Sequence, residues 1–130
     1  MPAAVLPVDL RAAATARALL RDTLAGRDGI RCDDALVMIS EVVTNAVRHT
    51  RDVLHLLIVV TGQSLRVEVT DDSPVVPTVP ALDLDGTGGR GLYIVDRLAD
   101  CWGVTPTAGG KTVWFEISLD GAAPARDARP

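Results

Sequence analysis

Hydrophobic residues recur at helical spacing in two segments near the start of the chain. We expect a first helix that Asp9 caps and that ends before Gly26. A second helix is predicted from about residue 33 to residue 49. The positions that share one side of the first helix are Leu10, Ala13, Ala14, Arg17, Leu20 and Leu24. The wide core-facing stripe of the second helix consists of Ala35, Leu36, Ile39, Val42, Val43, Ala46 and Val47.

The period of the hydrophobic positions then changes to two, which is typical of strands. Residues 53–60 and 65–70 are predicted strands, and a tight turn through residues 61–64 joins them into an antiparallel hairpin. A short amphipathic helix is predicted at about residues 91–99. Two further strands, 102–107 and 112–119, follow it and turn through Ala108, Gly109 and Gly110.

The segment between Asp72 and Gly88 has no hydrophobic period and is rich in proline and glycine. It is longer than the roughly 12 to 15 residues that structureless loops usually reach, which is typical of a functional or mobile lid. The element order is helix, helix, strand, strand, lid, helix, strand, strand. This order predicts an α+β fold, a two-layer α/β sandwich with a mostly antiparallel sheet covered by helices on one face.

Composition and charge restrict the organisation of the chain. With 130 residues, of which 48% are hydrophobic and 23% charged, we expect a single domain over residues 1–119. Residues 120–130 are predicted to form a disordered tail, because Ala, Pro, Arg and Asp alternate near the end without an apolar face. The two cysteines have no metal-ligand spacing, and we expect reduced, buried thiols.

The same figures exclude some classes of partner. The net charge of −4 and the aromatic share of 3% argue against nucleic acid as the main partner. Apolar runs stay far below the roughly 18 residues that a membrane helix needs, and the N-terminus has no recognisable leader. We therefore expect a cytoplasmic protein that does not contact a membrane.

The second predicted helix has one face that its apolar stripe leaves free. Glu41 and Asn45 lie four residues apart on this face, hence about one turn apart. Asp34, Met38, Arg48 and His49 are expected nearby on it. A carboxamide oxygen can bind Mg²⁺ while a neighbouring carboxylate deprotonates a nucleophile. The alternative is a solvated helix face.

Asp71 is the next inward position after Leu65, Val67 and Val69 in the strand alternation. A carboxylate at the inner end of a core strand is unfavourable unless it meets a donor. The amino group of adenine is one such donor. The alternative is a turn hydrogen bond within residues 71–73.

A cluster of glycines precedes the third predicted helix, at positions 86, 88, 89 and 91. Glycines let a backbone approach a ligand, and the free amides at a helix start favour phosphate. The alternative is a flexible hinge. The cluster matches the GxGxxG pattern of dinucleotide-binding proteins, but a proline-rich loop rather than a core strand precedes it, which excludes that interpretation. Lys111 and Thr112, at the start of the last strand, are further candidates for a functional role. The alternative is that they only belong to a plain hairpin turn.

In this order, four segments resemble the boxes of the GHKL ATPase superfamily, which includes gyrase, the heat-shock 90 chaperone and histidine kinases. ISEVVTNAVRH, from Ile39 to His49, resembles the N box, and the strand ending at Asp71 resembles the first glycine box. GGRGLYIVDRLAD, from Gly88, resembles the second glycine box, and GGKTVWFEI, from Gly109, the third. Within the superfamily, the chain is most similar to small single-domain anti-sigma-factor serine/threonine kinases. The resemblance extends from about Asp9 to Leu119 and implies the Bergerat ATP-binding fold.

The resemblance implies roles for particular residues. Glu41 would be the general base and Asn45 the Mg²⁺ ligand. Asp71 would accept the adenine amino group, and Thr112 would assist it through water. The remaining residues implied to contact the nucleotide are Gly89, Gly91 and Leu92, which would hold the phosphates, together with Ser73, Arg90, Arg48 and His49.

The chain departs from the family in the first glycine box, where Asp71 is followed by Asp72, Ser73, Pro74 and Val75 instead of two spaced glycines. Ser73 is small enough to leave room for adenine. The missing glycines stiffen the first hinge of the lid, and Asp72 adds a negative charge near an anionic ligand. The departure bears on how strongly the site binds and turns over nucleotide.

Three functions remain open at this point. The first is a kinase that uses Mg-ATP to phosphorylate a small antagonist protein of the STAS type, with a sigma factor as the second partner and a homodimer left open. The second is a nucleotide-binding module without catalysis that sequesters a regulator. The third is a sensory ATPase domain detached from its receptor. The third is less favoured because a dimerising helical hairpin with a phospho-acceptor histidine is not recognisable.

Overall fold

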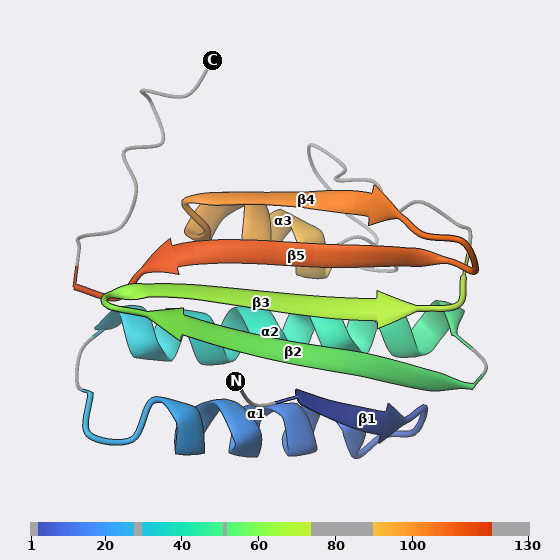
Figure 1. Cartoon of the computed structure of the whole chain (residues 1–130), viewed down its shortest axis with the longest axis horizontal. Coiled ribbons are helices and arrows are strands. Elements are labelled where there is room, and N and C mark those ends of the chain that lie inside the picture. Colours follow the sequence, from blue (N-terminus) through green and yellow to red (C-terminus); the bar gives the residue numbers. More distant parts are fainter. Residues whose placement is uncertain (1–2, 28–29, 51, 74–89, 121–130) are drawn as a thin grey trace.

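The computed structural model describes residues 3–27, 30–50, 52–73 and 90–120 (Figure 1). The predicted lid beyond Ser73 and the predicted tail beyond Asp120 lie outside the described residues. In chain order the elements are β1 (Ala3–Pro7), α1 (Ala12–Thr23), α2 (Ile30–His49), β2 (Val53–Thr61), β3 (Ser64–Asp71), α3 (Arg90–Leu98), β4 (Cys101–Pro106) and β5 (Lys111–Ser118).

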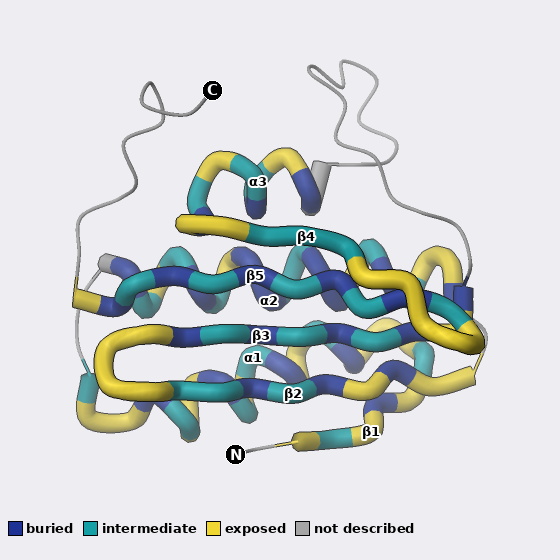
Figure 2. Tube along the Cα trace, turned by 45° about the horizontal axis from the view of Figure 1, so that its top comes forward, coloured by how far each residue is buried: buried dark blue, intermediate teal, exposed yellow. Residues whose placement is uncertain are grey.

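The described strands form one sheet in the order β1-β2-β3-β5-β4, with every neighbouring pair antiparallel. The helices cover one face of this sheet (Figures 1 and 2). α2 is the central helix, because it packs against both α1 and α3. The predicted two-layer α+β sandwich with helices on one face is therefore confirmed.

The core lies between the sheet and the helices. After the exposed Ser64, β3 alternates between buried and half-buried residues, and β5 does so along its whole length, so each strand gives one face to the core (Figure 2). The inner face of these strands is apolar as far as Val69 and Val113, and then ends in Asp71 and Lys111. Two charged residues therefore lie at one end of an otherwise apolar layer.

The predicted β2–β3 hairpin is confirmed. Thr61 pairs with Ser64, and Gly62 occupies the turn between them with φ +61°. A residue in this position of a two-residue turn needs positive φ, which glycine adopts without steric cost. The turn and the alternation on both sides fix the register, and hence the inward direction of Asp71.

The predicted start of the first helix is wrong. Leu10 is 98% exposed, and α1 begins at Ala12. Asp9 does not cap the helix: its Oδ1 accepts the Arg11 N–H over 2.7 Å in a turn before it. The buried stripe is instead Ala12, Ala16, Leu20 and Leu24, while Ala14 is exposed. The phase differs because the chain turns after β1 before the helical spacing begins.

β1 is an edge strand that the hydrophobic pattern did not predict. Among the described strands it pairs only with β2, and Leu6 is its one buried residue. With five residues it is too short to show a clear alternation.

The predicted burial of both thiols is also wrong: Cys32 is half-buried, and Cys101 is exposed on β4. None of the described helices combines the length and the apolar composition needed to cross a bilayer.

Candidate functional site

The segments that carry the predicted site residues come together at one end of the molecule. In Figure 1, α2 and β3 end and β5 begins at the right-hand side, and the start of α3 faces the same side. α2 also contacts β3, β5 and α3. The fold therefore gathers the four sequence boxes around the C-terminal half of α2.

Glu41 and Asn45 lie one turn apart on α2 and are both half-buried. Arg48 and His49 are exposed in the last turn. The Arg48 guanidinium there interacts favourably with the negative end of the helix dipole. Met38, which was expected on the same free face, is fully buried. This correction has a packing cause, because α3 packs against α2 and covers part of that face.

Glu41 borders an open groove between α1 and α2. The groove has a volume of about 370 Å³ and is lined by Arg17, Arg21, Asp33, Leu36, Val37, Ser40 and Glu41. Arg17 is held in place by donating to the Ser40 hydroxyl oxygen over 2.8 Å. The carboxylate of Glu41 is thus accessible from a surface that also carries two cationic side chains.

Asp71 is buried at the end of β3, with 4% of the residue exposed. Its Oδ1 accepts the Ser73 N–H over 2.9 Å, so the turn hydrogen bond considered as an alternative does form. Oδ1 also accepts a bond from Lys111 Nζ over 3.0 Å. Oδ2 is buried and has no hydrogen-bond partner among the described residues. The turn therefore uses one carboxylate oxygen and leaves the other for a further donor.

Lys111 was singled out from the sequence, but its contact with Asp71 was not predicted. It is 3% exposed, and Nζ also donates to the Ser73 carbonyl oxygen over 3.3 Å. The signal was present in the alternation, since Val113, Phe115 and Ile117 face inward and the next inward position is Lys111. A lysine at a hairpin is usually solvated, so burial of Lys111 was not expected from the sequence.

Thr112 lies on the opposite face of the sheet from Asp71. Its hydroxyl shares a hydrogen bond of 2.7 Å with that of Thr70, its cross-strand neighbour. Adjacent residues in a strand point to opposite faces, so Lys111 rather than Thr112 stands beside Asp71. The structure does not bring Thr112 to the carboxylate that the resemblance assigns it to assist.

Gly110 is a position at which the hairpin can hold only glycine. A Cβ there would meet the Asp71 carbonyl oxygen and would lie 2.7 Å from Asp72 Cα. We expect Gly110→Ala to lower the free energy of unfolding by about 1–3 kcal/mol, because backbone atoms cannot move aside as a flexible side chain can. Denaturant unfolding measures this loss. Gly109→Ala is the matched control, since a Cβ at Gly109 meets nothing within 4 Å. Equal losses in the two variants would contradict the steric cause.

The start of α3 supplies the segment predicted to hold phosphate. Arg90 is the first residue of the helix and Gly91 the second, whereas Gly89 lies outside the described residues. The Leu92 side chain is fully buried in the core. The first backbone N–H groups of a helix have no intrahelical acceptor, so the amides here suit an anion.

The outer face of the sheet carries a separate polar cluster. Arg66 donates to Glu68 over 2.8 Å and to Glu116 over 2.7 Å, and its guanidinium stacks on the Trp114 ring at 4.3 Å. The hydrogen bond from Arg66 holds the pKa of the Glu116 carboxyl below its usual value. Glu116 is the cross-strand partner of Arg66, and this partly exposed pair stabilises the sheet surface, whereas Glu68 lies on the same strand as Arg66. They lie on the face that is remote from Asp71.

Cys101 gives a pH-dependent test of this cluster. Cys101 is exposed as a residue, but partial desolvation of its thiol, followed by the hydrogen bond to Glu116, raises the pKa of Cys101. We expect half-maximal alkylation by iodoacetamide, measured in a Cys32→Ser background, at a pH above the ordinary thiol pKa of about 8.5. Glu116→Gln removes the adjacent anion and should shift the profile to lower pH. An unshifted profile would contradict the assigned cause.

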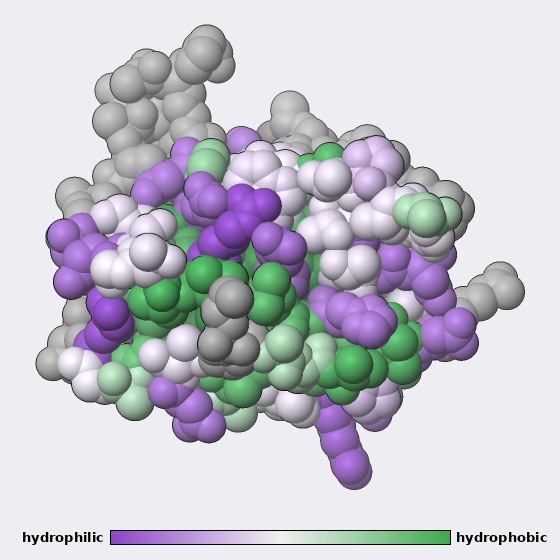
Figure 3. All heavy atoms as spheres, in the orientation of Figure 1, coloured by the Kyte–Doolittle hydropathy of each residue, from purple (hydrophilic) through white to green (hydrophobic). Residues whose placement is uncertain are grey.

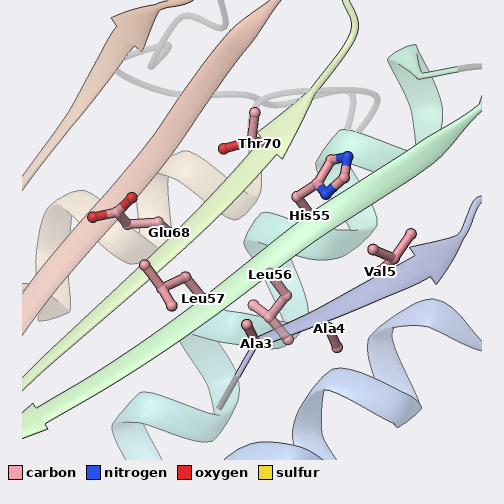
Figure 4. A pocket seen from close by; sticks show the side chains of 8 residues that line it. All are labelled: Ala3, Ala4, Val5, His55, Leu56, Leu57, Glu68 and Thr70. Carbon is pink, nitrogen blue, oxygen red and sulfur yellow. The ribbon is translucent and has the colours of Figure 1, made fainter. Parts of the chain in front are cut away.

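A groove of about 360 Å³ opens on the same outer face, and Ala3, Ala4, Val5, His55, Leu56, Leu57, Glu68 and Thr70 line it (Figure 4). Figure 3 shows hydrophobic residues gathered in the lower half of this face, over β1 and β2. The groove contains none of the predicted nucleotide residues. Thr70, whose hydroxyl shares a hydrogen bond with that of Thr112, lines this groove.

Comparison with known proteins agrees with the fold. Residues 6–117 match the family described as the histidine kinase-like ATPase domain. A histidine kinase domain from the blue-light activated histidine kinase of Erythrobacter litoralis EL346 superposes with a TM-score of 0.52 at 23% identity, covering 87% of this chain and 61% of that one. The Acinetobacter baumannii histidine kinase AdeS superposes with a TM-score of 0.54 at 16% identity, covering 93% and 69%.

A comparison with curated protein sequences finds no match. At these identities the solved structures show a shared fold, and the chain spans less than two thirds of the Erythrobacter domain's length. The family match extends over most of the chain and includes all four sequence boxes. The chain therefore belongs to the histidine kinase-like ATPase domain family.

Proposed function

We propose that this protein is an ATP-binding regulatory kinase that phosphorylates a serine or threonine of a small antagonist protein. The observation that carries the proposal is the position of Glu41. It lies one turn from Asn45 on α2 and borders an open groove that a protein substrate can enter. A base that serves a protein hydroxyl needs this access, whereas a base that serves only water does not.

The described residues divide the chemistry between them. Asn45 offers the hard carboxamide oxygen that Mg²⁺ prefers, and the ion would neutralise phosphate charge when bound. The free amides at the start of α3 suit the phosphates, and Asp71 Oδ2 suits the adenine amino group. Glu41 takes the proton from the substrate hydroxyl while the oxygen of that hydroxyl forms a bond to the γ-phosphorus. The bond from that phosphorus to the bridging oxygen then breaks and ADP leaves.

The biological output of this proposal is partner switching in the cytoplasm. The free protein sequesters a sigma factor, and phosphorylation of a STAS-type antagonist decides which partner it holds. The resemblance of the four boxes to the anti-sigma-factor kinase branch supports this assignment. Arg17 and Arg21, beside Glu41, provide cationic side chains for a protein partner.

The test is retention of partners from the native cytoplasm in Mg-ATP and in Mg-ADP, followed by phosphosite mapping with γ-labelled ATP. We expect acid-stable label on a serine or threonine of a small retained protein. Acid-labile label on a histidine would instead identify a sensory kinase domain. Absence of ATP binding in a direct titration would overturn the proposal as a whole.

A second candidate is a nucleotide-binding module without catalysis. Lys111 already occupies Asp71 Oδ1, Ser73 and Val75 stand in place of the two glycines of the first box, and Asp72 adds a negative charge between Asp71 and Ser73. The residues in place of the glycines make the first hinge of the lid stiffer. A stiffer hinge favours a pocket that binds nucleotide without turning it over. Saturable binding of Mg-ATP, without phosphate release and without a labelled partner, would select this function.

A further inference from the structure

We propose that Lys111 is a positioning residue that sets the base specificity of the nucleotide site through Asp71. The inference rests on the proposed function, in which the Asp71 carboxylate accepts the amino group of adenine. Lys111 holds one oxygen of this carboxylate in a fixed direction and leaves the other oxygen for the base.

The hydrogen bonds around Asp71 are divided unequally between its two oxygens. Oδ1 accepts from both Lys111 Nζ, over 3.0 Å, and the Ser73 N–H, over 2.9 Å. Oδ2 is equally buried and accepts from none of the described donors. A buried acceptor without a donor is unfavourable, so this oxygen favours a ligand that brings an N–H group.

Lys111 also fixes the backbone that carries this carboxylate. Its Nζ bridges Asp71 Oδ1 and the Ser73 carbonyl oxygen, 3.3 Å away, so one ammonium closes the turn after β3. Gly110 lets the start of β5 lie directly against the Asp71 carbonyl oxygen. The carboxylate is therefore held by a side chain, a backbone amide and a close backbone contact.

The charge of Lys111 matters as much as its position. The Asp71 and Lys111 side chains are 0% and 4% exposed, so each compensates a charge that would otherwise be buried alone. A neutral purine can then approach Oδ2 without burying an unpaired charge. Adenine presents an amino donor to this oxygen, whereas the 6-oxo group of hypoxanthine presents a second acceptor. Selection between these two bases should depend on Lys111.

The test is the ratio of the dissociation constants for ITP and ATP, measured by calorimetry with Mg²⁺. In Lys111→Met we expect this ratio to fall by about tenfold, the change that corresponds to one mispaired buried hydrogen bond. Asp71→Asn should also lower the ratio. Adding Lys111→Met to Asp71→Asn should lower it no further, because the two residues act through one carboxylate. Lys111→Gln takes the place of Lys111→Met if the methionine variant does not fold.

Arg66→Met is the matched control, because it removes another cation that bridges β3 and β5, but on the outer face. We expect it to leave the ratio unchanged. If Lys111→Met weakens ATP and ITP alike and keeps the ratio, Lys111 is only structural and the inference is overturned. If Asp71→Asn then still lowers the ratio, base recognition by Asp71 stands without Lys111. If the unmodified protein binds neither nucleotide, the inference is overturned together with the proposed function.

Discussion

Replacement of Glu41 by glutamine is expected to slow phosphoryl transfer by about 10²- to 10⁴-fold, the contribution of a positioned general base. The substitution keeps the shape of the side chain but removes its ability to take a proton. Glu41 is half-buried at the rim of a groove, and no described residue forms a hydrogen bond or ion pair with it. We therefore expect the fold and the affinity for ATP to remain near those of the unmodified protein.

The measurement is single-turnover transfer from γ-labelled ATP to the retained partner, with ATP affinity determined in parallel. Asp33→Asn is the matched control, because Asp33 is another carboxylate of α2 that lines the same groove. It should transfer at the unmodified rate. A Glu41→Gln variant that transfers as fast as this control would remove Glu41 from the mechanism.

Replacement of Arg31 by methionine is expected to cost about 2–4 kcal/mol of folding free energy, the range for breaking a buried, multiply bonded charge. Arg31 is 1% exposed near the start of α2. It donates to Asp34 over 2.8 Å and to the Leu98 carbonyl oxygen, at the end of α3, over 2.9 Å. Methionine fills similar space but leaves that carbonyl without its donor.

Thermal unfolding should show this loss as a fall in Tm of about 10 °C for a domain of this size. Arg66→Met is again the informative control. Arg66 makes two equally short carboxylate contacts, but it is 33% exposed, so its removal should cost about 1 kcal/mol or less. If the two variants unfold at the same temperature, burial is not what gives Arg31 its importance.

The fold was largely predictable because most of its elements have a strong local period. The β2–β3 hairpin was predicted to within about one residue, and the β4–β5 strands likewise, since alternation and the glycine turns agree. β1 was missed because an edge strand with one buried residue has almost no period. The phase of α1 was wrong because the turn before it decides where the helix begins.

The candidate site was predictable in part. The inward direction of Asp71 followed from counting along β3, and the neighbourhood of Glu41 and Asn45 followed from helical spacing. The partner of Asp71 did not follow, because Lys111 lies 40 residues away and meets it only through strand pairing. Met38 was assigned to an open face because the sequence does not say that α3 packs against α2.

The sequence by itself determined most of the helices and strands, the apolar sides of those with a clear period, and that a carboxylate ends the inner face of β3. These properties depend on residues close together in the chain, where the helical and strand periods operate. Only the tertiary structure decided that an ammonium neutralises this carboxylate, that Thr112 faces away from it, and that Arg31 joins α2 to α3. Burial and pairing of charges depend on contacts between distant segments, and no local pattern specifies these.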